Sequence, residues 1–379
     1  MSSGPRLARS VVVPVLISVV LLASLEGGCR VVRRLREGTW PVTRAVSYAR
    51  FVEDIGRAYQ PHPFLVASGR PNARLEKVGK VIQFNSLGYR GGPVDLPKPA
   101  GRFRILCAGG STTFDLLATN NDTTWPARLA QVLRARTGRD VDVVNAGFPG
   151  WTSVESLVSL ELRDIDLAPD LVIVFSGINE TQPAGHEPFT PDYSQGHGEL
   201  LPRILGLHPV PLRTASRFVF IEWLLDRAGK PSTKPEGFAP AWAWNGGARK
   251  NDIPPEAVAA FVRNLRSTAA VASANGAATL FVAQTALRRK GQETYDDEYI
   301  ESWAPGLTAA GYRRAVERYN EGAEGLAKAG LASFVNPFDS GFEDADFNDP
   351  VHFSDAGSAK MAERIADAVV QNTSWSANR

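Results

Sequence analysis

The stretch Arg104-Ile105-Leu106-Cys107-Ala108-Gly109-Gly110-Ser111-Thr112-Thr113-Phe114 decides how the rest of the chain is interpreted. Its apolar run is short enough for a buried strand, and two glycines and a serine follow it. A serine at such a turn lies at the carboxyl end of a strand, where open α/β sheets bind their ligands. The N–H groups of a following helix point toward any anion that forms there. Taken alone, the pattern is more typical of an ordinary turn than of a catalytic serine.

Apolar strands and amphipathic helices alternate through much of the remaining sequence. Strands are predicted at 102–108, 141–144, 171–175, 278–283 and 332–337, and helices at 125–137, 153–164, 254–275, 312–329 and 358–370. A strand that recurs after each helix predicts one parallel sheet of five strands, with right-handed crossovers and helices on its faces.

Residues 181–252 interrupt this alternation after the third strand and are rich in proline, glycine and tryptophan. An insertion at the carboxyl end of a strand is typical of a lid or a wall of a site. The apolar patch 218–225 is predicted to form a helix within it. Trp242 and Trp244 fit two interpretations equally well, either stacking on a sugar or acyl group or holding the insertion against the core.

The first 36 residues resemble an export or anchoring segment. Val11 to Leu25 is apolar between arginines, and it is shorter than the roughly 20 residues of a comfortable membrane span. Glu26 stands where a lipoprotein processing site before Cys29 has an aliphatic residue, so we do not expect lipidation. We expect a signal peptide or membrane anchor and an extracytoplasmic protein, anchored or secreted. A buried core helix is the alternative.

Charge and composition exclude several classes of function. The 42 basic and 40 acidic residues are spread along the chain, so no nucleic-acid partner is predicted. Two cysteines build neither a disulfide framework nor a cysteine-based zinc site. His186, His197 and His208 are too far apart for metal-ligand spacing, and the turn at Ser111 lacks the lysine of a P-loop. We therefore predict neither a metal nor a cofactor.

A base for Ser111 is available near the carboxyl end of the chain. An acyl-transfer serine needs a base of near-neutral pKa and a group that fixes the tautomer of that base. In Asp349-Pro350-Val351-His352, the carboxylate can fold back onto imidazole Nδ1 and leave Nε2 for the serine hydroxyl. A buried Asp–His pair with no catalytic role is the simpler interpretation of this motif by itself.

Three groups can stabilise the oxyanion of a tetrahedral intermediate, and each follows a predicted strand. They are the backbone N–H of Ser111, the backbone N–H of Gly150 and the side-chain amide of Asn179. Individually, Gly150 reads as a turn glycine and Asn179 as a helix cap. The carboxyl ends of parallel strands share one edge of a sheet, so the three groups can meet there.

The order of these motifs resembles the SGNH/GDSL hydrolase family. Its blocks are matched by Gly109-Gly110-Ser111-Thr112, Asn145 to Gly150, Gly177-Ile178-Asn179-Glu180 and Asp349 to His352. The resemblance implies a flavodoxin-like three-layer α/β/α domain over 101–372, after an extension and linker at 37–100. It also implies metal-free ester hydrolysis with Ser111 as nucleophile, His352 as base, Asp349 as its orienter, and Ser111, Gly150 and Asn179 as oxyanion donors.

Two positions depart from the family pattern. Gly110 replaces the name-giving aspartate, and Glu180 replaces the aspartate that usually follows the asparagine. Neither position acts on substrate in the scheme above, so we expect a structural adjustment at each.

The leading hypothesis is a serine esterase that removes short acyl groups, such as acetyl, from a carbohydrate or another ester. The first alternative is an O-acyltransferase on a cell-envelope polysaccharide, in which a sugar hydroxyl replaces water at the same site. The second is a catalytically silent glycan-binding or assembly protein.

Overall fold

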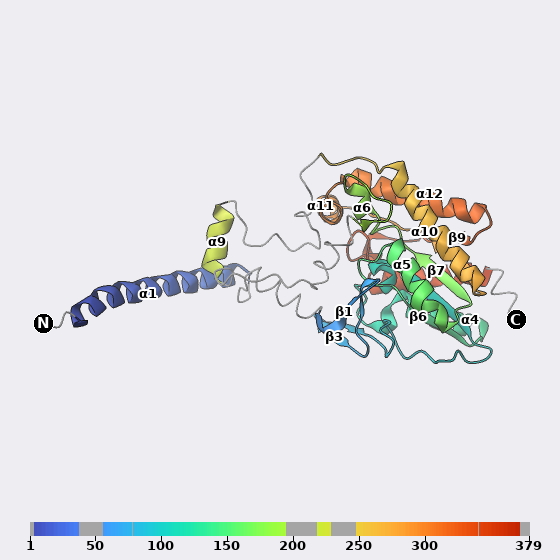
Figure 1. Cartoon of the computed structure of the whole chain (residues 1–379), viewed down its shortest axis with the longest axis horizontal. Coiled ribbons are helices and arrows are strands. Elements are labelled where there is room, and N and C mark those ends of the chain that lie inside the picture. The colour runs from blue at the N-terminus through green and yellow to red at the C-terminus, as the bar shows by residue number, and fades with distance from the viewer. Residues whose placement is uncertain are drawn as a thin grey trace. The chain divides into compact units, whose positions relative to one another are not determined.

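The computed structural model describes residues 4–37, 56–77, 79–194, 218–228, 248–339 and 341–371. The chain divides into two compact units, one of Met1–Asp54 with His208–Gly237 and one of Ile55–Leu207 with Phe238–Arg379 (Figure 1). His197, His208, Trp242 and Trp244 lie outside the described residues.

The larger unit contains the predicted parallel sheet. Its strands are β5 (Phe103–Gly109), β6 (Val141–Asn145), β7 (Leu171–Phe175), β8 (Ala278–Val282) and β9 (Ser333–Val335). They lie in the order β6-β5-β7-β8-β9, and every neighbouring pair is parallel. The chain therefore starts near the middle of the sheet and winds outward on both sides, as in a flavodoxin-like fold.

Helices cover both faces of this sheet, which confirms the predicted three layers (Figure 1). Leu106 of β5 faces a core shared with α10 (Pro255–Ala274) and α12 (Ala309–Lys328). Ile105 and Cys107 face the opposite core, shared with α4 (Trp125–Thr137) and α13 (Asp355–Gln371). Successive side chains of a strand point to opposite faces, so an apolar run is what a doubly covered strand requires.

Several elements differ from the predicted ones. The helix predicted at 153–164 is α5 (Ser153–Ser159), followed by a π-helical turn (Leu160–Asp164) and a 3₁₀ turn (Ile165–Leu167). Helix α12 begins at Ala309, earlier than predicted, because the Thr308 side chain accepts the N–H of Gly311 and caps it. Helix α11 (Glu293–Trp303) was not predicted. The remaining short elements are α3 (Ser111–Phe114), α6 (Thr181–Gly185) and the 3₁₀ turns Asn121–Thr123 and Asp344–Asp346.

The described residues between positions 56 and 100 belong to the same compact unit as the sheet. They form two antiparallel hairpins, β1 (Tyr59–His62) with β2 (Val66–Gly69), and β3 (Arg74–Lys77) with β4 (Lys80–Gln83). The ring of Tyr59 lies 4.8 Å from that of Phe148, and the ring of Phe84 lies 5.9 Å from that of Phe114. The Trp151 indole donates to the Ala67 carbonyl over 3.1 Å. The hairpins thus support the loop before Gly150 and the helix that Ser111 begins.

The smaller unit contains α1 (Gly4–Glu37) and α9 (Val219–Arg227), which pack against each other. Within α1, the segment Val12–Arg36 is long and apolar enough to cross a membrane, and its apolar side chains are exposed. The alternative of a buried core helix at the N-terminus is therefore wrong. The helix predicted at 218–225 is present as α9.

Candidate active site

Ser111 begins helix α3 directly after the turn that ends β5, and the glycines before it allow that turn. Gly109 has a φ of +150°. A Cβ at that position would collide with Thr113 Oγ1 and with the Phe175 carbonyl of the neighbouring strand. The Thr113 hydroxyl occupies this space and donates to the Phe175 carbonyl over 2.9 Å. Only glycine fits here, so the Gly-Gly-Ser sequence fixes where the serine leaves the sheet.

The structure brings Ser111, His352 and Asp349 together in one hydrogen-bonded row. His352 Nε2 lies 2.8 Å from Ser111 Oγ, and His352 Nδ1 lies 2.8 Å from Asp349 Oδ2. The other carboxylate oxygen, Oδ1, accepts the backbone N–H groups of Val351 at 2.9 Å and His352 at 2.8 Å. The tight turn anticipated for Asp-x-x-His therefore fixes the carboxylate and the imidazole together.

The charge of Asp349 suits this arrangement. Burial of the carboxyl opposes its ionisation, but attraction to His352 and three hydrogen bonds outweigh that effect, so the pKa of Asp349 lies below its usual range. An ionised Asp349 accepts a hydrogen bond from Nδ1–H, which leaves the Nε2 lone pair directed at the serine hydroxyl. The imidazole can then take the hydroxyl proton.

The predicted oxyanion donors follow β5, β6 and β7, and the Asn179 side-chain amide lies against Gly110, the residue before Ser111. The Asn179 side-chain amide donates one N–H to the Trp151 carbonyl over 2.7 Å and keeps a second N–H. Gly150 has a φ of +82°, a conformation that favours glycine. Within the described part of the chain, no hydrogen bond takes the backbone N–H of Ser111 or of Gly150.

The first departure from the family pattern has a steric cause. A Cβ on Gly110 would collide with Asn179 Nδ2 and lie 3.0 Å from the Trp151 carbonyl oxygen. The hydrogen-bonded pair of Asn179 and Trp151 therefore fills the space that a larger side chain would need. The Asn179–Trp151 hydrogen bond therefore requires glycine at position 110. This is a structural adjustment of the kind expected from the sequence.

The second departure, Glu180, connects two of the motif blocks. Its carboxylate is buried and accepts the N–H of Ser153 at 2.5 Å on Oε1 and the N–H of Gly177 at 2.9 Å on Oε2. Burial raises the pKa of Glu180 to about 7, and its hydrogen bonds oppose that shift. Ser153 follows the Gly150 turn and Gly177 precedes Asn179, so Glu180 ties the two predicted oxyanion blocks to each other.

Sequence reasoning missed a second buried acid, Asp115, which supports the far end of helix α3. Its carboxylate accepts the N–H of Trp125 at 2.8 Å and the hydroxyl of Ser358 at 2.7 Å. Arg90 donates to the carbonyls of Phe114 at 3.0 Å and Asp115 at 2.6 Å. Burial raises the pKa of Asp115 to about 6. These partners are distant in sequence, so no local pattern signals them.

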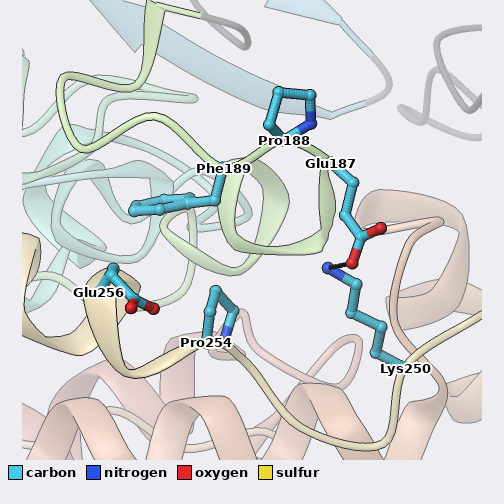
Figure 2. Close-up of a pocket in the computed structure, with 6 residues that line it drawn as sticks. All are labelled: Glu187, Pro188, Phe189, Lys250, Pro254 and Glu256. Carbon is cyan, nitrogen blue, oxygen red and sulfur yellow. Dashed lines mark ion pairs between the residues drawn. The ribbon is translucent and has the colours of Figure 1, made fainter.

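Among the described residues, no group of three or more histidine, cysteine, aspartate or glutamate side chains could hold a metal ion. A cavity of about 430 Å³ lies at the two described ends of the insertion, lined by Glu187, Pro188, Phe189, Lys250, Pro254 and Glu256 (Figure 2). Figure 2 shows the ion pair of Lys250 Nζ with Glu187 Oε1, 2.6 Å long, to one side of the other lining residues. None of the predicted site residues lines this cavity.

The sequence also matches a known family. The model of the GDSL-like lipase/acylhydrolase family matches residues 107–360, a range that contains every predicted site residue. The match spans well over half of the chain, so the protein belongs to this family and is a carboxylic ester hydrolase. No match was found among curated proteins.

Several solved structures are similar to this chain. The lipase/acylhydrolase of Enterococcus faecalis shares 16% identity over 70% of this chain and 95% of its own, with a TM-score of 0.41. The aryl esterase of M. smegmatis shares 16% identity over 71% of this chain and 99% of its own. A catalytic mutant of an acetylxylan esterase from Geobacillus stearothermophilus shares 14% identity over 70% of this chain and 93% of its own. Both structures have TM-scores of 0.39. Similarities of this size carry no information about the substrate of this chain.

Proposed function

We propose that this protein is a serine esterase in which Ser111 is the nucleophile, His352 the general base and Asp349 the residue that orients the base. The observation that carries the proposal is the row of hydrogen bonds from Asp349 through His352 to Ser111, each 2.8 Å long. A nucleophile and its base within hydrogen-bond reach, with a third group orienting the base, is the arrangement that serine acyl transfer requires.

The reaction then proceeds in two halves. Ser111 Oγ attacks the ester carbonyl carbon while its proton passes to His352 Nε2, and the carbonyl π electrons move onto oxygen. As the carbonyl re-forms, the bond to the alkoxy oxygen breaks and His352 returns the proton to the leaving alcohol. Water repeats the sequence on the acyl-enzyme, so the products are one alcohol and one carboxylic acid, and Ser111 is regenerated.

The backbone N–H groups of Ser111 and Gly150 and the second amide N–H of Asn179 stabilise the oxyanion in both halves. Their placement after successive parallel strands and the Asn179–Trp151 hydrogen bond support this assignment. Fixed donors of this kind need no reorganisation when the negative charge develops.

The substrate is an ester of a short acyl group, such as acetyl, on a carbohydrate or a similar alcohol. Its support is the enclosure of the site, since Ser111 is 9% and His352 7% exposed, which favours a small acyl group. The apolar helix α1 near the N-terminus supports an extracytoplasmic place at the cell envelope, where acylated polysaccharides occur.

Hydrolysis of p-nitrophenyl acetate, butyrate and octanoate tests the site and the acyl length together. We expect the acetate ester to react fastest and Ser111→Ala to abolish turnover. The exposed Ser273→Ala, on helix α10, is the matched control and keeps wild-type activity. Wild-type rates in Ser111→Ala would contradict the proposal.

A second assay separates hydrolysis from transfer. Labelled acetyl xylose is incubated with the enzyme and an unlabelled oligosaccharide. Release of labelled acetate supports the esterase, whereas label on the oligosaccharide supports the O-acyltransferase. Binding of the saccharide without turnover of any ester supports the silent binding protein.

A further inference from the structure

Helix α9, inside the insertion, presents large apolar side chains that the described protein does not cover. Phe218 just before the helix is 46% exposed, and Trp223 and Leu224 within it are 47% and 48% exposed. Trp223 stacks on Phe220 at 6.2 Å, and the Arg227 guanidinium lies 5.1 Å from the Trp223 ring. Contiguous exposed apolar groups of this size mark a surface that meets another apolar phase.

The N-terminus of α9 is held by Glu26, the acidic residue at the end of the apolar part of α1. Glu26 Oε1 accepts the N–H of Val219 at 3.0 Å, and Oε2 accepts the N–H of Phe220 at 2.8 Å. These are N–H groups that a helix start leaves without partners inside the helix, and a carboxylate is the group that suits them best. The Val219 side chain is 3% exposed. The two helices meet in Figure 1, and the Glu26 hydrogen bonds hold the start of α9 on α1.

From this arrangement we infer that α1 is retained as a membrane anchor, and that α9 lies beside it in the interfacial layer of the same bilayer. The inference does not depend on the catalytic assignment. It gives the insertion a role: a second membrane contact in a loop whose first residues follow Asn179 and Glu180.

A lipid surface is the partner because α9 packs on α1, and both helices expose large apolar side chains. At 1.5 Å per residue, nine helical residues extend about 14 Å, so α9 is too short to cross an apolar core of about 30 Å. A short helix with Trp and Arg side by side is typical of the interface, where the ring is half immersed and the guanidinium reaches water.

The position of Glu26 sets the depth of α9. Arg30 Nε binds Glu26 Oε1 over 2.6 Å, and three more arginines follow in α1. Arginines that follow an apolar helix mark the headgroup level. Glu26 lies one turn before Arg30, so the start of α9 is fixed just inside that level. Removing α1 as a signal peptide would leave α9 without its capping carboxylate.

Depth-dependent quenching tests this placement in the full-length protein. Leu224→Cys and Leu331→Cys, in a Cys29→Ser background, are labelled with an environment-sensitive nitrobenzoxadiazole dye. Leu331 is the matched control because it is 47% exposed and lies on the catalytic unit. Cys107 is fully buried and burial raises the pKa of its thiol, so it does not compete for the dye.

In vesicles of phosphatidylcholine and phosphatidylglycerol with spin-labelled lipids, we expect the Leu224→Cys label to be blue-shifted and quenched several-fold. The Leu331→Cys label should show neither effect. Equal behaviour of the two labels would overturn the inference. A blue shift without lipid that grows with protein concentration would also overturn it, because a second copy of the chain would then cover the face.

Glu26→Ala tests the contact that positions α9. We expect it to remove most of the quenching at Leu224→Cys, while the protein still floats with vesicles after an alkaline wash because α1 remains inserted. Unchanged quenching would contradict the role of Glu26. N-terminal sequencing of membrane-bound protein expressed with its complete sequence should find α1 present, and a chain that begins after Gly28 would overturn retention of the anchor.

Discussion

The two sides of the candidate site are built in different ways. On one side, Ser111, His352 and Asp349 meet through side chains, across 241 positions between serine and histidine. On the other side, Asn179 packs closely against Gly110, and Glu180 accepts backbone N–H groups from two loops. This side therefore depends on backbone groups and on close packing between the loops that follow the strands. In the proposed mechanism, the first side performs proton transfer and the second stabilises the negative charge of the oxyanion. Changes on the first side should therefore cost more activity than changes on the second.

The largest loss should come from His352→Ala. Without the imidazole no group takes the Ser111 proton, so we expect kcat on p-nitrophenyl acetate to fall by a factor of order 10³ or more. His62→Ala is the matched control, because the His62 ring accepts backbone N–H groups of its own turn and packs on Phe64. A loss smaller than that of Asn179→Ala would reverse the ranking of the two sides.

Asn179→Ala removes one oxyanion donor and the partner of the Trp151 carbonyl. We expect kcat to fall by about 10²–10³, the usual effect of one lost donor, with a smaller change in KM. Asn275→Ala, at the exposed end of helix α10, changes the same residue type away from the site and should leave kcat unaltered. A pure KM effect in Asn179→Ala would mean that the amide binds substrate and does not stabilise the transition state.

Gly110→Ala sharpens the comparison, because it adds one methyl group and removes no chemical group. The new Cβ must displace Asn179 Nδ2 or the Trp151 carbonyl. We expect kcat to fall about 10- to 100-fold, as for a misplacement of about 1 Å. At Gly92 a Cβ meets nothing within 4 Å, so Gly92→Ala is the control. Equal activity of the two variants would show that close packing at Gly110 is not needed.

Glu180→Gln should have the smallest effect on turnover and a clear effect on stability. Burial raises the pKa of Glu180 from 4.5 to about 7, so the folded state favours the protonated form. The contribution of this group to the free energy of unfolding is complete below about pH 4.5 and falls by about 3 kcal/mol as the pH rises through 7. Because Gln cannot ionise, the Glu180→Gln variant lacks this decrease of the free energy of unfolding with pH.

Urea unfolding of wild type and Glu180→Gln at pH 5 and pH 8 measures the difference. Wild type should lose more stability than the variant between these two values. Glu324→Gln, at a partly exposed ion pair on helix α12, should keep the wild-type slope. If Glu180→Gln shows the same pH dependence of stability as wild type, then Glu180 is ionised throughout this range in the folded protein, and its pKa is not raised.

The same contrast explains what the sequence could predict. The sheet strands were predictable because strands covered on both faces are short apolar runs, and the Ser111, His352 and Asp349 cluster because its residue types and their order are distinctive. Helix α11 was not, since its sequence Glu-Thr-Tyr-Asp-Asp-Glu-Tyr-Ile-Glu-Ser-Trp is largely acidic and its short stripe is mostly aromatic, made of Tyr295, Tyr299, Ile300 and Trp303. A buried ion pair helps to hold it, with Asp296 Oδ1 2.6 Å from Arg289 Nη2.

The other side of the site was predictable only in part. Asn179 and Gly150 were predicted as oxyanion donors from their positions after strands. Glu180 connects the two motif blocks through a hydrogen bond to Ser153, which is 27 positions away. Glycine is needed at position 110 because the Asn179 side chain lies where a Cβ would be. A local sequence pattern shows neither a contact between residues so far apart in the chain nor the space that a neighbouring side chain occupies.

Labelling with a fluorophosphonate followed by peptide mapping shows whether His352 activates Ser111. We expect wild type to be labelled on the peptide containing Ser111, and His352→Ala, which keeps the serine, to lose the label. Label on another serine, or equal labelling of Ser111 in wild type and His352→Ala, would contradict the activation of Ser111 by His352.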